Sequence, residues 1–397
     1  MAREDNWRLG DLGSSIFRIG LVIGILGLAA SAFLGLFQEG NEGRFYHAWL
    51  VNFCFFLSLS LGALFFVIIQ HLTGATWSVV VRRIAESVAA NIWLVFLFFV
   101  PVVIGMDQLY PWSVPAFVEA HPLVKAKEAF LNPQFFFIRT ALYFAIWIGL
   151  SQYFLRKSMA QDDDGSISTT LKMERASAPA ALLFALTLTF ASFDYLMSLS
   201  PEWFSTIFGV YYFSGSLLSF FALLPIIVIF LQSKGRIQHA VTIEHFHDMG
   251  KWLFGFTVFW AYIGFSQYFL IWYANLPEET GWYFVRKHGG WDTISWIMLF
   301  GHFLIPFFGL LPRWVKIWRP TLAFWSIYIL AMHWLDIFWI AVPAWSPDRV
   351  PWSVLDLTCF LGMGGIFLAV IAHRLRDRSL VPVRDPRLSG SLTFENV

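Results

Sequence analysis

The feature that most constrains this chain is a series of ten apolar stretches, each long enough to cross a lipid bilayer. A hydrocarbon core of about 30 Å takes roughly 20 residues in a helix, because only a helix satisfies its backbone polar groups within the segment. The stretches lie at 14–36, 46–71, 84–106, 134–156, 177–198, 205–231, 250–275, 291–312, 320–342 and 350–374. The sequence therefore predicts an all-α polytopic membrane protein, with residues 1–397 forming a single integral membrane domain.

Composition excludes several other classes of protein. Charged residues make up 13% of the chain, against roughly a quarter in a soluble domain, so lipid must solvate much of its apolar surface. A net charge of +1 offers no polyanion-binding surface, which argues against nucleic acid as a partner. The two cysteines, Cys54 and Cys359, lie far apart within apolar stretches and form neither a disulfide framework nor a metal motif.

The distribution of Lys and Arg predicts the orientation of the spans. Most of the 27 basic residues flank the spans on the side that carries both ends of the chain, whereas residues such as Lys125 and Arg349 lie on the other side. Cytoplasmic loops carry the excess of basic residues. We therefore expect both termini to be cytoplasmic and the number of spans to be even.

The connections between the spans suggest three further features. The outer segment 107–133 is rich in proline and aromatic residues, which predicts an ordered cap. The inner segment 157–176 contains QDDDGS and reads as a solvated loop. We expect the polar tail from Ser379 to lie in water or along a partner, and Asp248 to cap a helix that begins near Met249.

Charged residues within the spans are the strongest functional signal, because a charge at membrane depth is costly. Asp194 in span five and Asp336 in span nine each lie a few residues from the outer end, roughly 6–9 Å deep at 1.5 Å per residue. Arg139 in span four lies at a comparable depth. We expect Arg139 to pair with one acid as a structural ion pair, which leaves the other acid as a candidate proton carrier.

Two histidines lie near these acids. His333 precedes Asp336 by one helical turn, and His302 lies at a similar depth on the preceding span. Three interpretations stay open. The pair could relay protons to Asp336, ligate a b-type haem, or only pack and bond to helix carbonyls.

A second group of titratable residues lies near the inner ends of spans three and seven. It consists of Glu86, Glu244, His247 and Asp248. Acids at helix starts are commonplace, yet an inner group and an outer group are also what two halves of a proton path would require. The predicted path runs from this inner group through water to His302, His333, Asp336 and Asp194, with Arg139 beside it.

Two longer motifs resemble a known family. They are TFASFDYLMSLSPEWFSTIFGVYYFSGS at 189–216 and HDMGKWLFGFTVFWAYIGFSQYFLIWYANLPEETGWYFVR at 247–286. With the ten-span layout, they resemble the F-type (ActF-type) membrane subunit of bacterial alternative complex III, a quinol:cytochrome c oxidoreductase. That subunit is related to the NrfD and PsrC family of membrane proteins. On this resemblance, Asp194 matches the family's buried acid, and His247 and Asp248 match the start of the second motif.

The resemblance implies an architecture and a set of partners. Spans two to five and six to nine would form two four-helix bundles, with spans one and ten outside them. The partners would be a paralogous NrfD-like quinol-binding subunit, an iron–sulfur subunit and c-type cytochromes, all in or on the bacterial inner membrane. Haem c and iron–sulfur clusters would belong to these partners, and quinol or menaquinol would be the small-molecule substrate. No cofactor is expected on this chain itself.

The resulting hypothesis is a respiratory electron-transport subunit that contributes a proton path and a docking surface and is not catalytic by itself. The first alternative is a secondary transporter or ion carrier. The similarity of IGLSQYFL (148–155) to IGFSQYFL (263–270) favours it, because transporters often contain inverted repeats. A membrane electron carrier with b-type haem on His302 and His333 is the second. A purely structural membrane anchor is the third.

Overall fold

A computed structural model describes residues 6–37 and 40–396 as an all-α polytopic membrane protein. Ten helices in these residues are long and apolar enough to span a membrane. The spans are formed by α1 (Asp11–Leu36), α2 (Glu42–Leu72), α3 (Val79–Ala89) with α4 (Ile92–Phe98) and α5 (Val100–Ile104), α9 (Pro133–Asp164), α10 (Ile167–Tyr195), α11 (Phe208–Ser233), α12 (Ile243–Ala274), α14 (Trp291–Ile297) with η3 (Met298–Leu304) and α15 (Ile305–Leu310), α17 (Arg319–Ala341) and α18 (Val354–Leu375). The predicted number and order of spans are confirmed.

Short helices form the connections between the spans and, in the case of α19, part of the C-terminal tail. They are α6 (Met106–Leu109), η1 (Pro111–Ser113), α7 (Pro115–Ala120), α8 (Pro122–Lys125), η2 (Met197–Leu199), α13 (Pro277–Val285), α16 (Arg313–Ile317), η4 (Val342–Ala344) and α19 (Leu388–Leu392). The segment 107–133 is indeed an ordered cap, with Trp112 buried and the Lys127 ammonium donating to the carbonyl of Pro201 at 2.7 Å.

The inner ends of several helices extend further than hydropathy predicts. α9 continues through the acidic run to Asp164 and ends at Gly165, whose φ of 63° requires the left-handed region. The predicted inner loop 157–176 is therefore wrong, because only Gly165 and Ser166 separate α9 from α10. Hydropathy detects the part of a helix inside the bilayer and misses polar turns that continue it into water.

The start of span seven also differs from the prediction. α12 begins at Ile243, where Thr242 and His245 form a reciprocal capping box. Asp248 therefore lies within the second turn of the helix and does not cap it. Its carboxylate pairs with Lys251 at 2.5 Å, one turn further along the same helix.

The packing of the spans matches the predicted architecture. In the first bundle, α2 packs against α3, α9 and α10, and in the second, α11 packs against α12 and α17. α2 and α11 pack against each other and join the two bundles. Outside them, α1 pairs with α18 so closely that a Cβ on Gly27 would lie 2.5 Å from the backbone nitrogen of Gly362.

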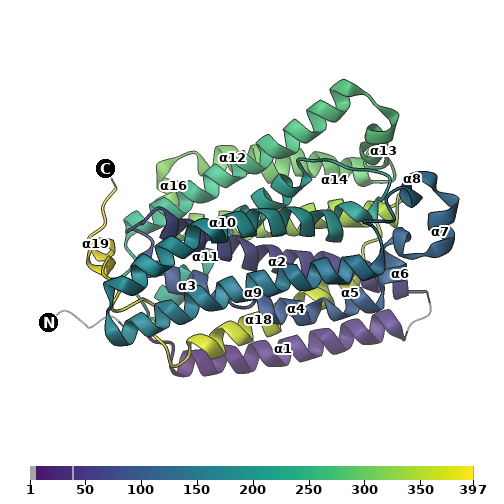
Figure 1. Cartoon of the computed structure of the whole chain (residues 1–397). Coiled ribbons are helices and arrows are strands. Elements are labelled where there is room, and N and C mark those ends of the chain that lie inside the picture. The colour runs from purple at the N-terminus through teal and green to yellow at the C-terminus, as the bar shows by residue number, and fades with distance from the viewer. Residues whose placement is uncertain (1–5, 38–39, 397) are drawn as a thin grey trace.

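Both described ends of the chain lie at the same end of the helical bundle, on the side of α16 and α19 (Figure 1). This agrees with an even number of spans, whereas the assignment of that end to the cytoplasm stays a prediction. The tail packs against the rest of the chain, so the predicted position in water is wrong, whereas the alternative position along a partner stays a prediction. The backbone N–H of Leu380 donates to the carbonyl of Trp7 at 2.7 Å, Asp385 pairs with Arg82, and Ser391 donates to the carbonyl of Trp77.

Candidate functional site

Asp194, in the last turn of α10, forms an ion pair within the first bundle. The Arg139 guanidinium, from α9, binds both carboxylate oxygens, with Nε at 2.9 Å from Oδ2 and Nη2 at 2.7 Å from Oδ1. The Tyr143 hydroxyl donates to Oδ2 at 2.8 Å. The predicted pairing of Arg139 with one of the acids is confirmed, and the paired acid is Asp194.

Aromatic rings hold the guanidinium in place. Its carbon lies 3.8 Å from the ring centre of Phe130 and 4.3 Å from that of Phe135, and Nη1 donates to the carbonyl of Phe130 at 2.9 Å. Stacking and bidentate bonding both favour arginine over lysine at such a position. Asp194 therefore has a fixed counter-ion that cannot leave without breaking several contacts.

Asp336, in α17 of the second bundle, has a different environment. The Tyr211 hydroxyl from α11 donates to Oδ1 at 2.5 Å, and the Trp260 indole N–H from α12 donates to Oδ2 at 3.1 Å. The residue is 2% exposed. Within residues 6–37 and 40–396, no basic side chain lies within salt-bridge distance of it. Two neutral donors, and no cation, hold this carboxyl group.

Both predicted histidines lie beside Asp336 or its donors. The ring centre of His302 is 3.9 Å from that of Trp260, so the residue that bonds Asp336 also contacts this imidazole. His333 Nε2 lies 2.9 Å from the Ser58 hydroxyl of α2. Both histidines are buried, and both ring nitrogens of His302, together with Nδ1 of His333, lack a hydrogen-bond partner in the described chain. We define the Asp336 cluster as Ser58, Tyr211, Trp260, His302, His333 and Asp336.

The backbone around the cluster is specialised in two places. His302 lies in η3, a π-helical segment within span eight; such segments occur mostly as single turns and frequently at functional sites. On α11, a Cβ on Gly215 would lie 2.8 Å from Cε1 of His333. Glycine at this position therefore makes room for the imidazole.

Axial ligation of a haem by the two histidines finds little support in this packing. The Trp260 indole covers the ring of His302, and Nε2 of His333 is engaged with Ser58. A macrocycle between the imidazoles would have to displace both contacts. The packing therefore favours the relay interpretation over the haem interpretation.

A buried cation lies beyond the outer end of α17. Arg286, which follows α13, donates to the carbonyls of Trp339 and Ile340 at 3.1 and 2.8 Å. Its guanidinium carbon lies 3.2 Å from the ring centre of Trp282, and burial lowers the pKa of Arg286 well below its usual value. The nearby phenol of Tyr283 is also buried, which raises its pKa to about 12. Arg286 thus caps the helix that carries Asp336 without touching the carboxyl group.

The inner residues do not form the single group that the sequence predicts. Glu86 lies between Arg82 and Arg83, at 3.3 and 3.2 Å, in an ion network that the buried Asp385 and the partly exposed Asp162 complete. The remaining three, Glu244, His247 and Asp248, lie on the first turns of α12. Glu86 therefore has its charge balanced by arginines, a role that its spacing of three and four residues from them could have indicated.

Several residues of the site carry no distinguishing signal in the sequence. Tyr211, Trp260 and Tyr143 are aromatic residues among 44 Phe, 20 Trp and 12 Tyr, and Ser58 is one small residue within a continuous apolar run. In such a background, a side chain that donates to a carboxylate looks the same as one that only packs. Their roles depend on how the helices pack against each other.

Comparison with known proteins adds no family assignment. Neither a scan against models of protein families nor a search of curated proteins finds a match to this chain. The resemblance to the membrane subunit of alternative complex III therefore remains a prediction from the two sequence motifs.

Proposed function

We propose that this chain is a non-catalytic membrane subunit of a quinol:cytochrome c oxidoreductase, or of one that reduces another periplasmic carrier. Its part in the reaction would be to conduct protons through the Asp336 cluster and to provide a docking surface for redox subunits. The resemblance of the two sequence motifs supports the proposed reaction class, and the geometry around Asp336 supports the proposed proton role.

The proposed proton role rests on one difference: Asp336 has neutral hydrogen-bond donors, whereas Asp194 has an arginine counter-ion. The Asp336 carboxyl group is buried, and among residues 6–37 and 40–396 it receives hydrogen bonds only from Tyr211 and Trp260. Gaining or losing a proton at Asp336 therefore breaks no ion pair, and the Tyr211 hydroxyl and the Trp260 indole can stay beside the two carboxyl oxygens in either state. Intramembrane acids of this kind are typical of proton relays.

The neighbouring imidazoles provide the next step of the relay. A neutral imidazole accepts a proton at one ring nitrogen and releases one from the other. Counting the described residues, His302 offers two nitrogens without partners and His333 offers one, and water in the same space would complete their hydrogen bonds. In this proposal protons pass between these histidines and Asp336, and water connects the cluster with the two surfaces.

The rest of the assembly belongs to the same proposal. The chain would lie in the bacterial inner membrane with a paralogous quinol-binding subunit, an iron–sulfur subunit and c-type cytochromes. Those partners would hold the haem and iron–sulfur centres, and the electrons would not pass through this chain.

The transporter alternative receives less support from the backbone. Inverted-repeat transporters bind substrate at unwound segments of paired helices. Span three is interrupted at Ala90 and Asn91, and span eight contains η3, but the residues at these interruptions keep right-handed helical torsion angles. Neither interruption presents an unwound backbone to a substrate.

The test is a proton-release measurement on the assembly that this chain forms in native membranes. Co-purification of c-type cytochromes and a large iron–sulfur protein is the first expected result, and a lone, colourless chain would contradict the assembly. In liposomes, Asp336→Asn should lower the number of protons released per electron while quinol oxidation continues. The matched control is Asp292→Asn, an exposed acid at the start of α14. Equal proton yields in both variants would show the proton role to be wrong.

A further inference from the structure

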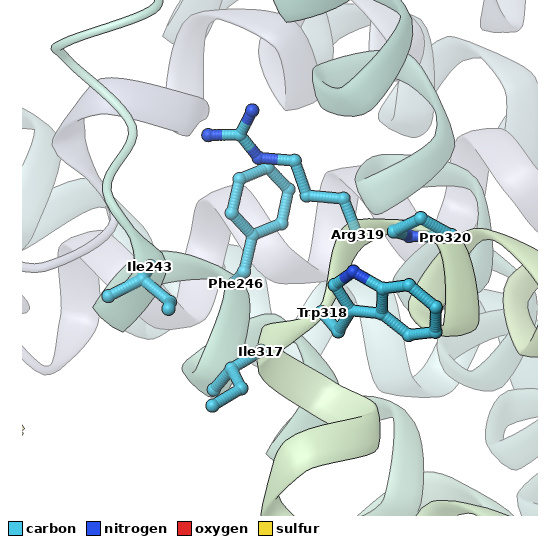
Figure 2. Close-up of a pocket in the computed structure, with 6 residues that line it drawn as sticks. All are labelled: Ile243, Phe246, Ile317, Trp318, Arg319 and Pro320. Atoms are coloured by element: carbon cyan, nitrogen blue, oxygen red, sulfur yellow. The ribbon is translucent and has the colours of Figure 1, made fainter.

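An apolar pocket of about 350 Å³ opens at the inner end of the second bundle. Its walls come from the first turn of α12 and from the junction of α16 with α17. They are formed by Ile243, Phe246, Ile317, Trp318, Arg319 and Pro320. Figure 2 shows the guanidinium group of Arg319 extended over the ring of Phe246, with the side chains of Ile243, Ile317 and Trp318 around it.

The pocket combines an apolar wall with an available positive charge. The Arg319 guanidinium carbon lies 5.4 Å from the ring centre of Phe246. Within the described chain, Arg319 has no carboxylate at salt-bridge distance and no hydrogen-bond partner. Arg319 is also the first residue of the 23-residue helix α17, whose N-terminal end carries a partial positive charge.

The segment has two other basic residues, Arg313 and Lys316, and neither lines the pocket. The Lys316 ammonium donates to the carbonyls of Leu310, Leu311 and Pro312 at 2.7 to 3.2 Å, and burial lowers its pKa. It closes the end of α15 and is not aimed at a ligand. Arg319 is therefore the cation that the pocket presents.

The surroundings place this pocket at a membrane–water boundary. It lies where α12 and α17 begin, at the end of the bundle that also holds α16 and α19 (Figure 1). Trp314 and Trp318 of the same segment are both 58% exposed. Exposed tryptophans are enriched at the headgroup level of a bilayer, where one part of the ring is apolar and the other is wet.

We propose that this pocket binds one anionic phospholipid, with the phosphate on Arg319 and part of an acyl chain against Ile243, Phe246 and Ile317. A headgroup phosphate supplies the negative charge that Arg319 lacks. The apolar wall offers contact to an acyl chain, and pockets of roughly 300–1,000 Å³ are the usual size for small ligands. Basic pockets between helices at the cytoplasmic surface recognise anionic lipids in the same way. This inference does not depend on the proposed respiratory role.

The test counts lipids on the delipidated protein by native mass spectrometry, with added phosphatidylglycerol or phosphatidylcholine. We expect one phosphatidylglycerol to bind in preference to phosphatidylcholine. Arg319→Gln should weaken phosphatidylglycerol binding roughly fivefold, the effect of one basic residue near an anionic lipid surface. Arg319→Lys should retain most of the binding. The control is Arg349→Gln, an exposed arginine at the opposite end of the bundle, which should have no effect.

Two further measurements separate a lipid from a free anion. Ile243→Ser should weaken both lipids alike, because it removes apolar contact without changing charge. Excess inorganic phosphate should fail to displace phosphatidylglycerol, because phosphate makes no contact with the apolar wall. Equal binding of the two lipids, equal losses in Arg319→Gln and Arg349→Gln, no effect of Ile243→Ser, or displacement by phosphate would each overturn the proposal.

Discussion

The two buried acids near the outer ends of the bundles share chemistry but have different partners. Asp194 and Asp336 each lie on the last span of a four-helix bundle, and each accepts a hydrogen bond from a tyrosine hydroxyl. Asp194 has Arg139 as a bidentate counter-ion, whereas Asp336 has the neutral indole of Trp260 in the corresponding role. Within the described residues, one carboxylate has a cationic partner and the other has only neutral donors.

The difference shows how similar acids acquire separate roles. A buried ion pair keeps both charges compensated only while both partners are present, so its removal is costly and its protonation is opposed. A carboxyl group bonded by neutral donors has no such constraint. We therefore expect Asp194 to contribute mainly to stability, and proton transfer stays the proposed role of Asp336, although the sequence motif around Asp194 is the one that resembles the family.

The largest expected effect is on the paired acid. Arg139→Met leaves the Asp194 carboxylate buried without a counter-ion and also removes the guanidinium from between Phe130 and Phe135. The free energy of unfolding should fall by about 3–5 kcal/mol, measured as denaturant unfolding in detergent. The control Lys125→Met removes an exposed ion pair with Glu119 and should change little. Equal losses in the two variants would contradict the structural assignment of Arg139.

The two aspartates can be compared directly with the same substitution. Asp194→Asn leaves the Arg139 cation buried and unpaired, so we again expect a loss of about 3–5 kcal/mol. Asp336→Asn leaves at most one neutral donor without an acceptor and should cost about 1–3 kcal/mol. Unfolding measurements on both variants test the order. A reversed order would mean that Asp336 normally has a counter-ion and that the comparison is wrong.

The two tyrosines give a smaller and sharper version of this comparison. Tyr211→Phe removes one of the two donors to Asp336, whereas Tyr143→Phe leaves Asp194 with its arginine. We expect Tyr211→Phe to lower proton release per electron and Tyr143→Phe to leave it unchanged, with stability losses of up to about 3 kcal/mol in each, because each hydroxyl donates to a carboxylate. If Tyr143→Phe alone lowered proton release, Asp194 would be the proton carrier.

The sequence predicts the framework of this molecule much better than its site. Long apolar stretches identify ten spans because the bilayer fixes their length, and the basic residues give their alternation. The same signal fails at 157–176, at the start of α12 and in the tail, where polar residues continue helices or fold back through Arg82 and Asp385. Hydropathy contains no information on these polar contacts.

At the site, the sequence predicts the ionisable residues but not what distinguishes them. Asp194, Asp336, Arg139, His302 and His333 stand out because charge and imidazole are rare in an apolar chain. The choice of Asp194 as the partner of Arg139 depends on which helices are neighbours, α9 with α10. The donors to Asp336 come from α11 and α12, far away in sequence, and their roles depend on helix rotation, which no local pattern records.

The smallest expected effect reports on the charge of Asp336 itself. Trp260→Phe keeps a ring near His302 and removes the N–H donor to Asp336, and Trp147→Phe is its matched control because the Trp147 indole donates to the hydroxyl of Thr187 at 2.8 Å. A hydrogen bond to an ionised acceptor contributes about 1.5–3 kcal/mol and one to a neutral acceptor about 0.5–1.5 kcal/mol. At low pH, with Asp336 protonated, the two variants should lose similar stability. As the pH rises and Asp336 ionises, Trp260→Phe should become the more destabilising variant, which unfolding at several pH values would detect. A constant difference between the variants across the pH range would mean that Asp336 keeps one protonation state and cannot carry a proton.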